Sequence, residues 1–182
     1  MQNAFLFLAN AVCSFFSALL LLRLIMQWRR ISFYSPAGGF ILKFTNWAVL
    51  PMRRVIPGAG GLDWASLFAA FLTQIFFAAL LCFFSPIVHT LGDVISARGL
   101  FAVLALALTN LAQLLLTLLI ILLFAQAILS WVNPCSPLVR PLAQITSPLL
   151  APVRRLIPPI SGIDISPLIV IVILQALSLL IR

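Results

Sequence analysis

Four long apolar stretches constrain the fold of this chain more than any other feature of its sequence. They cover approximately residues 4–26, 64–84, 100–131 and 165–181. A helix needs about 20 apolar residues to cross a hydrocarbon layer about 30 Å thick. Because no water satisfies backbone polar groups in that layer, stretches of this kind cross it as helices. The sequence therefore predicts an all-α membrane protein with four transmembrane helices.

The composition of the chain agrees with this prediction. Hydrophobic residues make up 64% of the sequence and charged residues only 8%, whereas soluble proteins average about 45–50% apolar and about 25% charged residues. A soluble domain of this length has too little interior to bury so much apolar surface. The net charge is +8. Since the basic residues lie between the apolar stretches, they favour the lipid bilayer and its anionic headgroups over nucleic acid as the partner.

The distribution of basic residues predicts how the chain is oriented. Two long connectors, which follow the first and third apolar stretches, contain most of them: Arg29, Arg30, Lys43, Arg53 and Arg54 in the first, and Arg140, Arg154 and Arg155 in the second. The loop between the second and third stretches contains only Arg98. Cytoplasmic loops are enriched in lysine and arginine. Both connectors should therefore be cytoplasmic, with the middle loop and both termini on the opposite side.

The connectors also contain an internal repeat with an offset of 101 residues. Residues 51–57, Pro-Met-Arg-Arg-Val-Ile-Pro, align with residues 152–158, Pro-Val-Arg-Arg-Leu-Ile-Pro. The same offset aligns Gly61, Asp63 and Gln74 with Gly162, Asp164 and Gln175. Such self-similarity indicates a repeated structural unit. We expect one helix–connector–helix unit in residues 1–84 and another in 100–182, joined by a short external loop at 85–99. Two spans per unit give both units the same orientation.

The second connector predicts a short helix at the membrane interface. Thr146 can cap its start, and Ile145, Leu149 and Val153 then fall on one side, with Arg154 opposite them. An apolar side facing lipid and a guanidinium facing headgroups are typical of an interfacial helix. Pro152 should kink or interrupt it.

An aspartate precedes each returning span, ten residues after an arginine pair. Asp63 and Asp164 can accept hydrogen bonds from the first-turn N–H groups of the helices that follow. In the simpler interpretation the aspartates cap helices and the arginines set the topology. In the alternative, these residues form a site for a lipid headgroup, an ion or a partner protein, composed of Arg53, Arg54, Asp63, Arg154, Arg155 and Asp164.

Polar residues within the spans are few. Gln74 and Gln175 lie near the centre of the bilayer, eleven residues after their aspartates. Amides at this depth either bond to a neighbouring helix or line a permeation path. Arg23, near the cytoplasmic end of the first span, is expected to extend its long side chain to the interface. Gln126 replaces it in the second unit.

The sequence contains no arrangement of residues typical of an enzyme. There are three aspartates, no glutamate and a single histidine, His89. Metalloprotease, phosphate-loop and catalytic-triad patterns do not occur. Cys13, Cys82 and Cys135 form no pair with metal-ligand spacing. We therefore expect neither catalysis nor a metal or cofactor.

The doubled P-x-R-R-x-I-P and G-x-D motif, with T-x-P-L-L before its second copy, resembles the YggT family, also called YlmG, in its two-repeat form. The resemblance implies a bacterial inner-membrane protein with no established enzyme activity, in which the orientation predicted from the basic residues would make the termini periplasmic. Roles suggested for the family include osmotic-stress tolerance linked to cation uptake, positioning of division factors and cofactor assembly. The first copy departs from the usual pattern at Ala65 and Trp47, where the family usually has serine and proline.

Two hypotheses for the function follow. In the first, the chain is a membrane platform or assembly factor whose Arg-rich connectors bind headgroups or a protein partner. In the alternative, it is a cation-transport or osmotic-stress protein of potassium or sodium homeostasis, acting as a homo-oligomer. The repeated motif in the connectors favours the first hypothesis.

Overall fold

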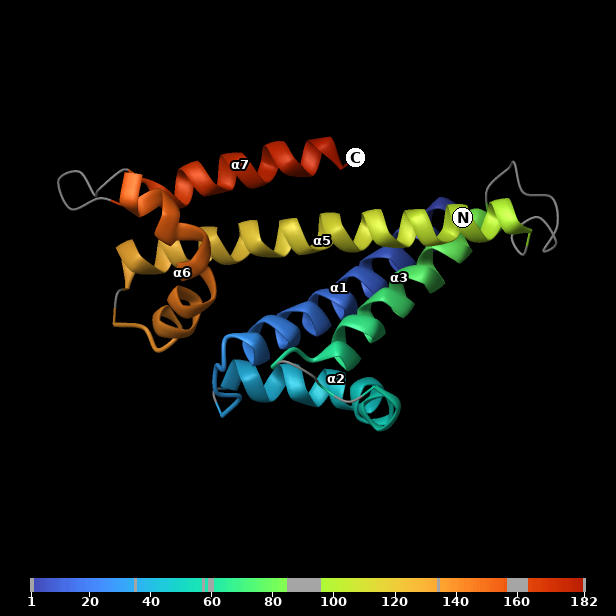
Figure 1. The fold of residues 1–182 in the computed structure, drawn as a ribbon, viewed down its shortest axis with the longest axis horizontal. Helices are drawn as coiled ribbons and strands as arrows, with labels where there is room; N and C mark the ends of the chain where they lie inside the picture. Colours follow the sequence, from blue (N-terminus) through green and yellow to red (C-terminus); the bar gives the residue numbers. More distant parts are fainter. Residues whose placement is uncertain are drawn as a thin grey trace.

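The computed structural model describes residues 2–34, 36–56, 58, 61–84, 96–133, 135–156 and 164–181. This part of the chain is helical and contains no strand (Figure 1). Its six helices are, in order, α1 (Gln2–Trp28), α2 (Pro36–Val55), α3 (Trp64–Phe83), α5 (Ala97–Val132), α6 (Val139–Leu156) and α7 (Ser166–Leu180). The predicted all-α class is therefore confirmed.

Three helices are long and apolar enough to cross a membrane: α1, α3 and α5, with 27, 20 and 36 residues. They coincide with the first three predicted spans to within three residues. The fourth predicted span corresponds to α7, an apolar helix of 15 residues. At about 1.5 Å per residue, α7 is about 22 Å long, which is shorter than the usual hydrocarbon thickness.

The helices follow one another in the same order in both halves of the chain. α1 and α5 run in the same general direction, and α3 and α7 return in the other (Figure 1). α3 packs against both α1 and α5, while α7 packs against α5 and α6. The connector helices α2 and α6 both lie at the end of the molecule where α1 and α5 finish (Figure 1). The arginine pairs lie in the last turns of these two connector helices.

Small residues line the contacts among α1, α3 and α5. Ala65, Ala69, Ala70, Ala78 and Ala107 are all buried, with at most 3% of their surface exposed. Side chains of this size let helix backbones approach closely, which is the usual way in which helices associate in lipid.

Large apolar side chains cover the outside of the bundle. Phe7 on α1, Phe76 on α3 and Phe101 on α5 are all more than half exposed. A soluble monomer rarely exposes such an extensive apolar surface. The outer surface thus has the composition expected of one that faces lipid.

The connector helices are longer than predicted. α2 has 20 residues and α6 has 18, so the expectation of a short helix beginning at Thr146 is wrong. α6 begins at Val139, and Thr146 lies in its middle, where its hydroxyl donates to the Leu142 carbonyl at 2.9 Å. Pro148 and Pro152 both lie inside the helix. Pro152 therefore does not interrupt it.

A contact between the two halves accounts for the tolerance of one of these prolines. Pro148 has no N–H, so the carbonyl of Gln144 loses its usual partner within the helix. That carbonyl instead accepts a hydrogen bond of 2.9 Å from Nε of Arg29. Nη2 of the same arginine donates to Ser147 Oγ at 3.0 Å. Arg29 thereby joins the end of α1 to α6.

Residues 85–95 of the predicted external loop lie outside the described part of the chain. The last residues of that loop are helical, because α5 begins at Ala97. The side chain of Ser96 caps this helix by accepting a hydrogen bond from the N–H of Gly99 at 3.2 Å.

Candidate functional site at the connector end

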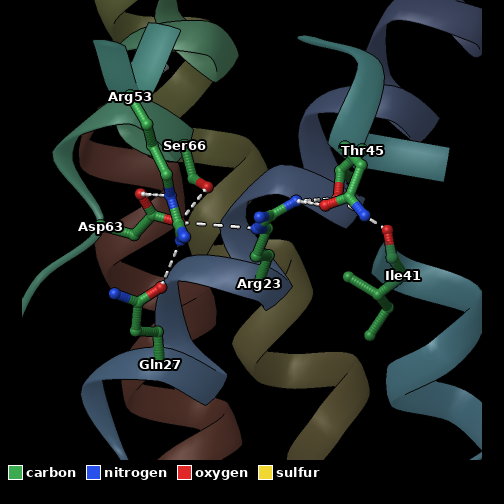
Figure 2. A network of polar contacts seen from close by, with 8 residues as sticks. Arg23, Gln27, Ile41, Thr45, Arg53, Asp63 and Ser66 are labelled. Carbon is green, nitrogen blue, oxygen red and sulfur yellow. Dashed lines mark hydrogen bonds and ion pairs between the residues drawn. The ribbon is translucent and has the colours of Figure 1, made fainter. Parts of the chain in front are cut away.

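Asp63 is the centre of a buried polar network in the first half of the chain (Figure 2). It precedes α3, and its side chain is completely buried. Arg53, in the last turn of α2, donates from Nη2 to Oδ2 at 2.6 Å and from Nε to Oδ1 at 3.3 Å. Ser66 donates from Oγ to Oδ2 at 2.7 Å. The carboxylate therefore holds the end of α2 against the start of α3.

Arg23 extends this network into the first predicted span. Its Nε lies 3.5 Å from Oδ2 of Asp63, and its Nη1 donates to Thr45 Oγ1 at 2.7 Å and to Asn46 Oδ1 at 2.9 Å. The prediction that Arg23 extends to the interface is wrong, since only 2% of the residue is exposed. It points inward because three acceptors from α2 and the start of α3 surround its guanidinium (Figure 2).

The network carries an excess positive charge. Two guanidinium groups, of Arg23 and Arg53, share one carboxylate. Nε of Arg23 is buried and has no hydrogen-bond partner within the described residues. The side-chain amide oxygen Oε1 of Gln27 on α1 accepts a further hydrogen bond from Arg53 Nη2 at 2.7 Å. Among the described residues, Asp63 is thus the one negative group that compensates both cations, of which Arg23 is buried and Arg53 partly exposed.

Opposing effects act on the Asp63 carboxyl. Burial raises its pKa, but the hydrogen bonds from Arg53 and Ser66 and the charges of Arg53 and Arg23 outweigh burial. The net pKa lies below the usual value for aspartate. Asp63 therefore remains ionised at neutral pH.

The second half repeats the ion pair in a more exposed form. Arg154, near the end of α6, donates from Nε and Nη2 to Oδ2 of Asp164, at 2.8 and 2.5 Å. The side chains of this pair are 44% and 29% exposed, respectively. Burial raises the pKa of Asp164, but hydrogen bonds from Ser166 and Arg154 and the charge of Arg154 lower it overall.

The position of Arg23 is occupied by an amide in the second half. Gln126 on α5 is buried, and its Oε1 accepts a hydrogen bond from Oγ1 of Thr146 on α6. Within the residues that the structure describes, no polar contact links Gln126 to Asp164. One continuous charged network in the first half thus corresponds to two separate contacts in the second, a neutral one and an exposed ion pair.

The predicted capping role holds for one aspartate and not for the other. Oδ1 of Asp164 accepts a hydrogen bond of 3.0 Å from the N–H of Ser166, the first residue of α7. The Asp63 side chain makes no capping bond to the backbone of α3. Its oxygens instead accept hydrogen bonds from the Arg53 guanidinium and the Ser66 hydroxyl, and bonds from a guanidinium to a carboxylate are strong.

The two arginines of each connector pair differ in their surroundings. Arg53 and Arg154 are bound to the aspartates, whereas Arg54 and Arg155 are exposed. The latter two have no hydrogen bond or ion pair among the described residues. Of the six residues predicted to bind a headgroup or partner, four are thus joined in two internal pairs. Arg54 and Arg155 remain accessible to a ligand.

One side of α2 carries exposed aromatic residues. Phe40, Phe44 and Trp47 are 46–71% exposed and recur at helical spacing. Lys43 is exposed on the same helix. An aromatic face flanked by cations is the arrangement found in helices that lie at a membrane surface.

The two central amides have different environments. Gln74 on α3 is buried and donates from Nε2 to Ser17 Oγ on α1 at 3.1 Å, which is a bond between helices of the kind expected. Gln175 on α7 is exposed. The structure does not bring the two amides together, because α5 lies between α3 and α7 (Figure 1).

Sequence reasoning missed the partners Arg23, Ser17 and Arg29. A signal for the first was present, because an arginine inside an apolar span usually has a specific polar partner. The described residues contain no group of three or more histidine, cysteine or acidic side chains able to hold a metal. The three cysteines are free thiols.

Comparisons with known proteins agree with the motifs. The chain is 35% identical to the uncharacterized protein YggT of Escherichia coli (strain K12), over 98% of this chain and 89% of that protein. It is 36% identical to an uncharacterized protein from the proC 3' region of Vibrio alginolyticus, over 96% of this chain and 91% of that one. A protein of Pseudomonas aeruginosa is 32% identical over 100% of this chain and 89% of its own length.

The comparison with solved structures gives no match. The model of the CCB3/YggT family matches residues 2–90 and 105–182, which together make up most of the chain. With these matches and the paired Arg–Asp motifs, the chain belongs to the CCB3/YggT family.

Proposed function

We propose that this protein is a non-catalytic platform of the bacterial inner membrane that binds anionic phospholipid headgroups at its connector end. The observation that carries the proposal is the division of each arginine pair. Arg53 and Arg154 are bound to aspartates, while Arg54 and Arg155, one residue later, are exposed and have no hydrogen bond or ion pair among the described residues. The same division occurs in both halves, so each connector helix presents in its last turn one exposed guanidinium group that is unpaired within the described part of the chain.

The proposed orientation places α2 and α6 on the cytoplasmic side and the termini in the periplasm. Its support is the concentration of basic residues at the connector end, compared with Arg98 alone at the start of α5. Membrane proteins follow this bias. In this arrangement α7 is the fourth span. Its short length would be accommodated by local thinning of the bilayer, at a modest free-energy cost.

The Arg–Asp pairs have a supporting role in this proposal. By holding the C-terminal end of each connector helix, Asp63 and Asp164 determine where the next arginine projects. A planar guanidinium can donate two parallel hydrogen bonds to a phosphate. The exposed aromatic residues of α2 would lie among the acyl chains below the headgroups. The connector end would then bind lipid with its charged edge and its apolar face together.

Retention of lipid by the purified protein tests the proposal. The protein is extracted from vesicles of phosphatidylethanolamine and phosphatidylglycerol, and bound lipids are counted by native mass spectrometry. Arg54→Gln with Arg155→Gln should lose most of the retained phosphatidylglycerol. The matched control is Arg98→Gln, which removes an exposed charge from the other end of α5. Equal retention of phosphatidylglycerol by the double variant and by the control would contradict the proposal.

Two further measurements separate this function from the others. Cross-linking in cells from the connector end would detect a protein partner, and its loss in the same double variant would make that partner the ligand. Potassium and sodium flux into liposomes containing the protein tests the cation-transport alternative. Flux above that of empty liposomes would support cation transport as the function and contradict the platform proposal.

A further inference from the structure

A row of polar side chains occupies one outer face of α5. This face is marked at its connector end by Phe124, Ile128 and Trp131, which line a groove between α5 and α7. Helical residues 7, 11 and 14 positions apart share a face. Counting back from Phe124 by these intervals gives the list of polar residues on this face: Thr117, Gln113 and Asn110.

α7 contributes to the same face. Leu168 and Ile171 line the groove from the α7 side. Gln175 follows them by seven and four residues, so it lies on the same side of α7, and it is exposed. Asn110 and Gln113 are partly exposed. The α5–α7 face is defined here as the outer surface that bears Asn110, Gln113 and Gln175.

The three amides of the α5–α7 face have no hydrogen-bond partner in the part of the chain that the structure describes. Thr117 differs, because its Oγ1 donates to the Gln113 carbonyl at 2.8 Å. Gln113 lies near the middle of the 36-residue helix α5, which in the proposed spanning arrangement places it within the hydrocarbon layer. Amides left unbonded in hydrocarbon are costly, so polar groups at this depth normally face protein.

The first half shows how such an amide is satisfied. Gln74, the counterpart of Gln175, bonds to Ser17 because α1 covers that side of α3. Among the described helices, α3 packs against α1, α2 and α5, whereas α7 packs mainly against α5 and α6. No described helix of the chain covers the amide side of α7.

We propose that the α5–α7 face binds the same face of a second copy of this chain, related by a two-fold axis along the membrane normal. Asparagine and glutamine side chains each donate and accept hydrogen bonds. A row of them without formal charge is therefore complementary to its own copy, as a two-fold interface requires. Two copies in one membrane have the same orientation, which this axis preserves. The proposal rests on the membrane-spanning arrangement proposed above, and not on headgroup binding.

Energy transfer between two labelled pools of the protein, reconstituted together at high lipid dilution, measures the association constant. A variant with all three amides replaced by leucine, Asn110→Leu, Gln113→Leu and Gln175→Leu, should have an association constant lower by on the order of tenfold or more. Each hydrogen bond between helices in lipid contributes only a small part of the affinity, so the three losses are measured together. The matched control is Asn10→Leu. It removes an exposed amide of α1 that accepts a bond from Ser14 in its own helix.

Cross-linking locates the interface without changing the amides. In a background with its three cysteines replaced by alanine, Leu168→Cys should cross-link between copies through a short bis-maleimide. Phe76→Cys on α3 should not, although both residues are 61% exposed. This readout remains valid even where the triple leucine variant fails to fold.

The outcomes divide clearly. Association that depends on the three amides, with cross-linking at residue 168 and not at 76, supports the proposal. A monomeric wild type, equal cross-linking at both positions, or an association constant unchanged by the triple variant overturns it. Each of these results leaves lipid retention to be decided by its own measurement, so failure of this interface is distinguishable from failure of the platform.

Discussion

The two halves of the molecule contain the same connector motif in two different electrostatic environments. In the first, Asp63 is completely buried and balances Arg23 and Arg53. In the second, Asp164 pairs with Arg154 at the surface, and the neutral Gln126 occupies the place of Arg23. The comparison teaches that the same Arg–Asp motif can contribute very differently to the stability of the folded protein. The buried pair is the one accompanied by an arginine on the preceding long helix, and the exposed pair is the one where a glutamine stands there.

Removing the buried carboxylate should have the largest effect on stability. Asp63→Asn leaves Arg23 and Arg53 near each other without a compensating charge, so we expect a loss of about 3–5 kcal/mol in the free energy of unfolding. Asp164→Asn should cost about 1 kcal/mol or less, because solvent screens the exposed pair. Reversible unfolding in mixed micelles measures both. Equal losses would show that the two halves do not differ as described.

Placing an arginine in the second half is the next largest perturbation. Gln126→Arg introduces a buried cation where no carboxylate of the described residues contacts Gln126, and we expect a loss of about 2–4 kcal/mol. The control is Gln126→Met, an uncharged side chain of similar length, which separates the loss of the Thr146 bond from the cost of burying a charge. The same unfolding assay applies. A stable Gln126→Arg variant would mean that Asp164 can turn inward and reproduce the first network.

The reciprocal change should be better tolerated. Arg23→Gln removes the excess cation and leaves Arg53 paired with Asp63, while the amide can still reach Thr45 as Gln126 reaches Thr146. We expect a loss of about 1–2 kcal/mol, which corresponds to one or two net hydrogen bonds. A loss as large as that of Asp63→Asn would indicate that Arg23, and not Arg53, is the main partner of the carboxylate.

Acidification should have the smallest effect at accessible pH. The pKa values of Asp63 and Asp164 are lowered in the folded protein. Their contribution to stability is therefore fully present above the unfolded pKa of about 3.9, and it is lost as pH falls through the folded pKa. Thermal unfolding should show constant stability from neutral pH to about 5, and a decline below about 4. Asp63→Asn should remove more of this decline than Asp164→Asn does, and the reverse order would contradict the comparison.

Much of the architecture follows directly from the sequence. The first three spans, the all-helical class and the membership of the family could be predicted from apolar length and from the doubled motif. The doubled motif placed Arg53, Arg54 and Asp63 and their second-half counterparts in one candidate set, but the sequence did not predict that arginine and aspartate form ion pairs. It did not show which arginine of each pair is bound, because that depends on how the end of each connector helix is rotated about its axis.

The sequence by itself determined where apolar and basic residues alternate, because lipid selects for length and composition, which are properties of a linear stretch. Only the tertiary structure decided that Arg23 turns inward, that Arg54 and Arg155 are left accessible, and that Gln74 is covered while Gln175 is not. Each of these depends on which helix lies beside the residue. Residues such as Arg23 and Asp63 are 40 positions apart, and no local pattern specifies that they meet. Burial of a charge is therefore a property of the packed bundle and not of the motif that supplies it.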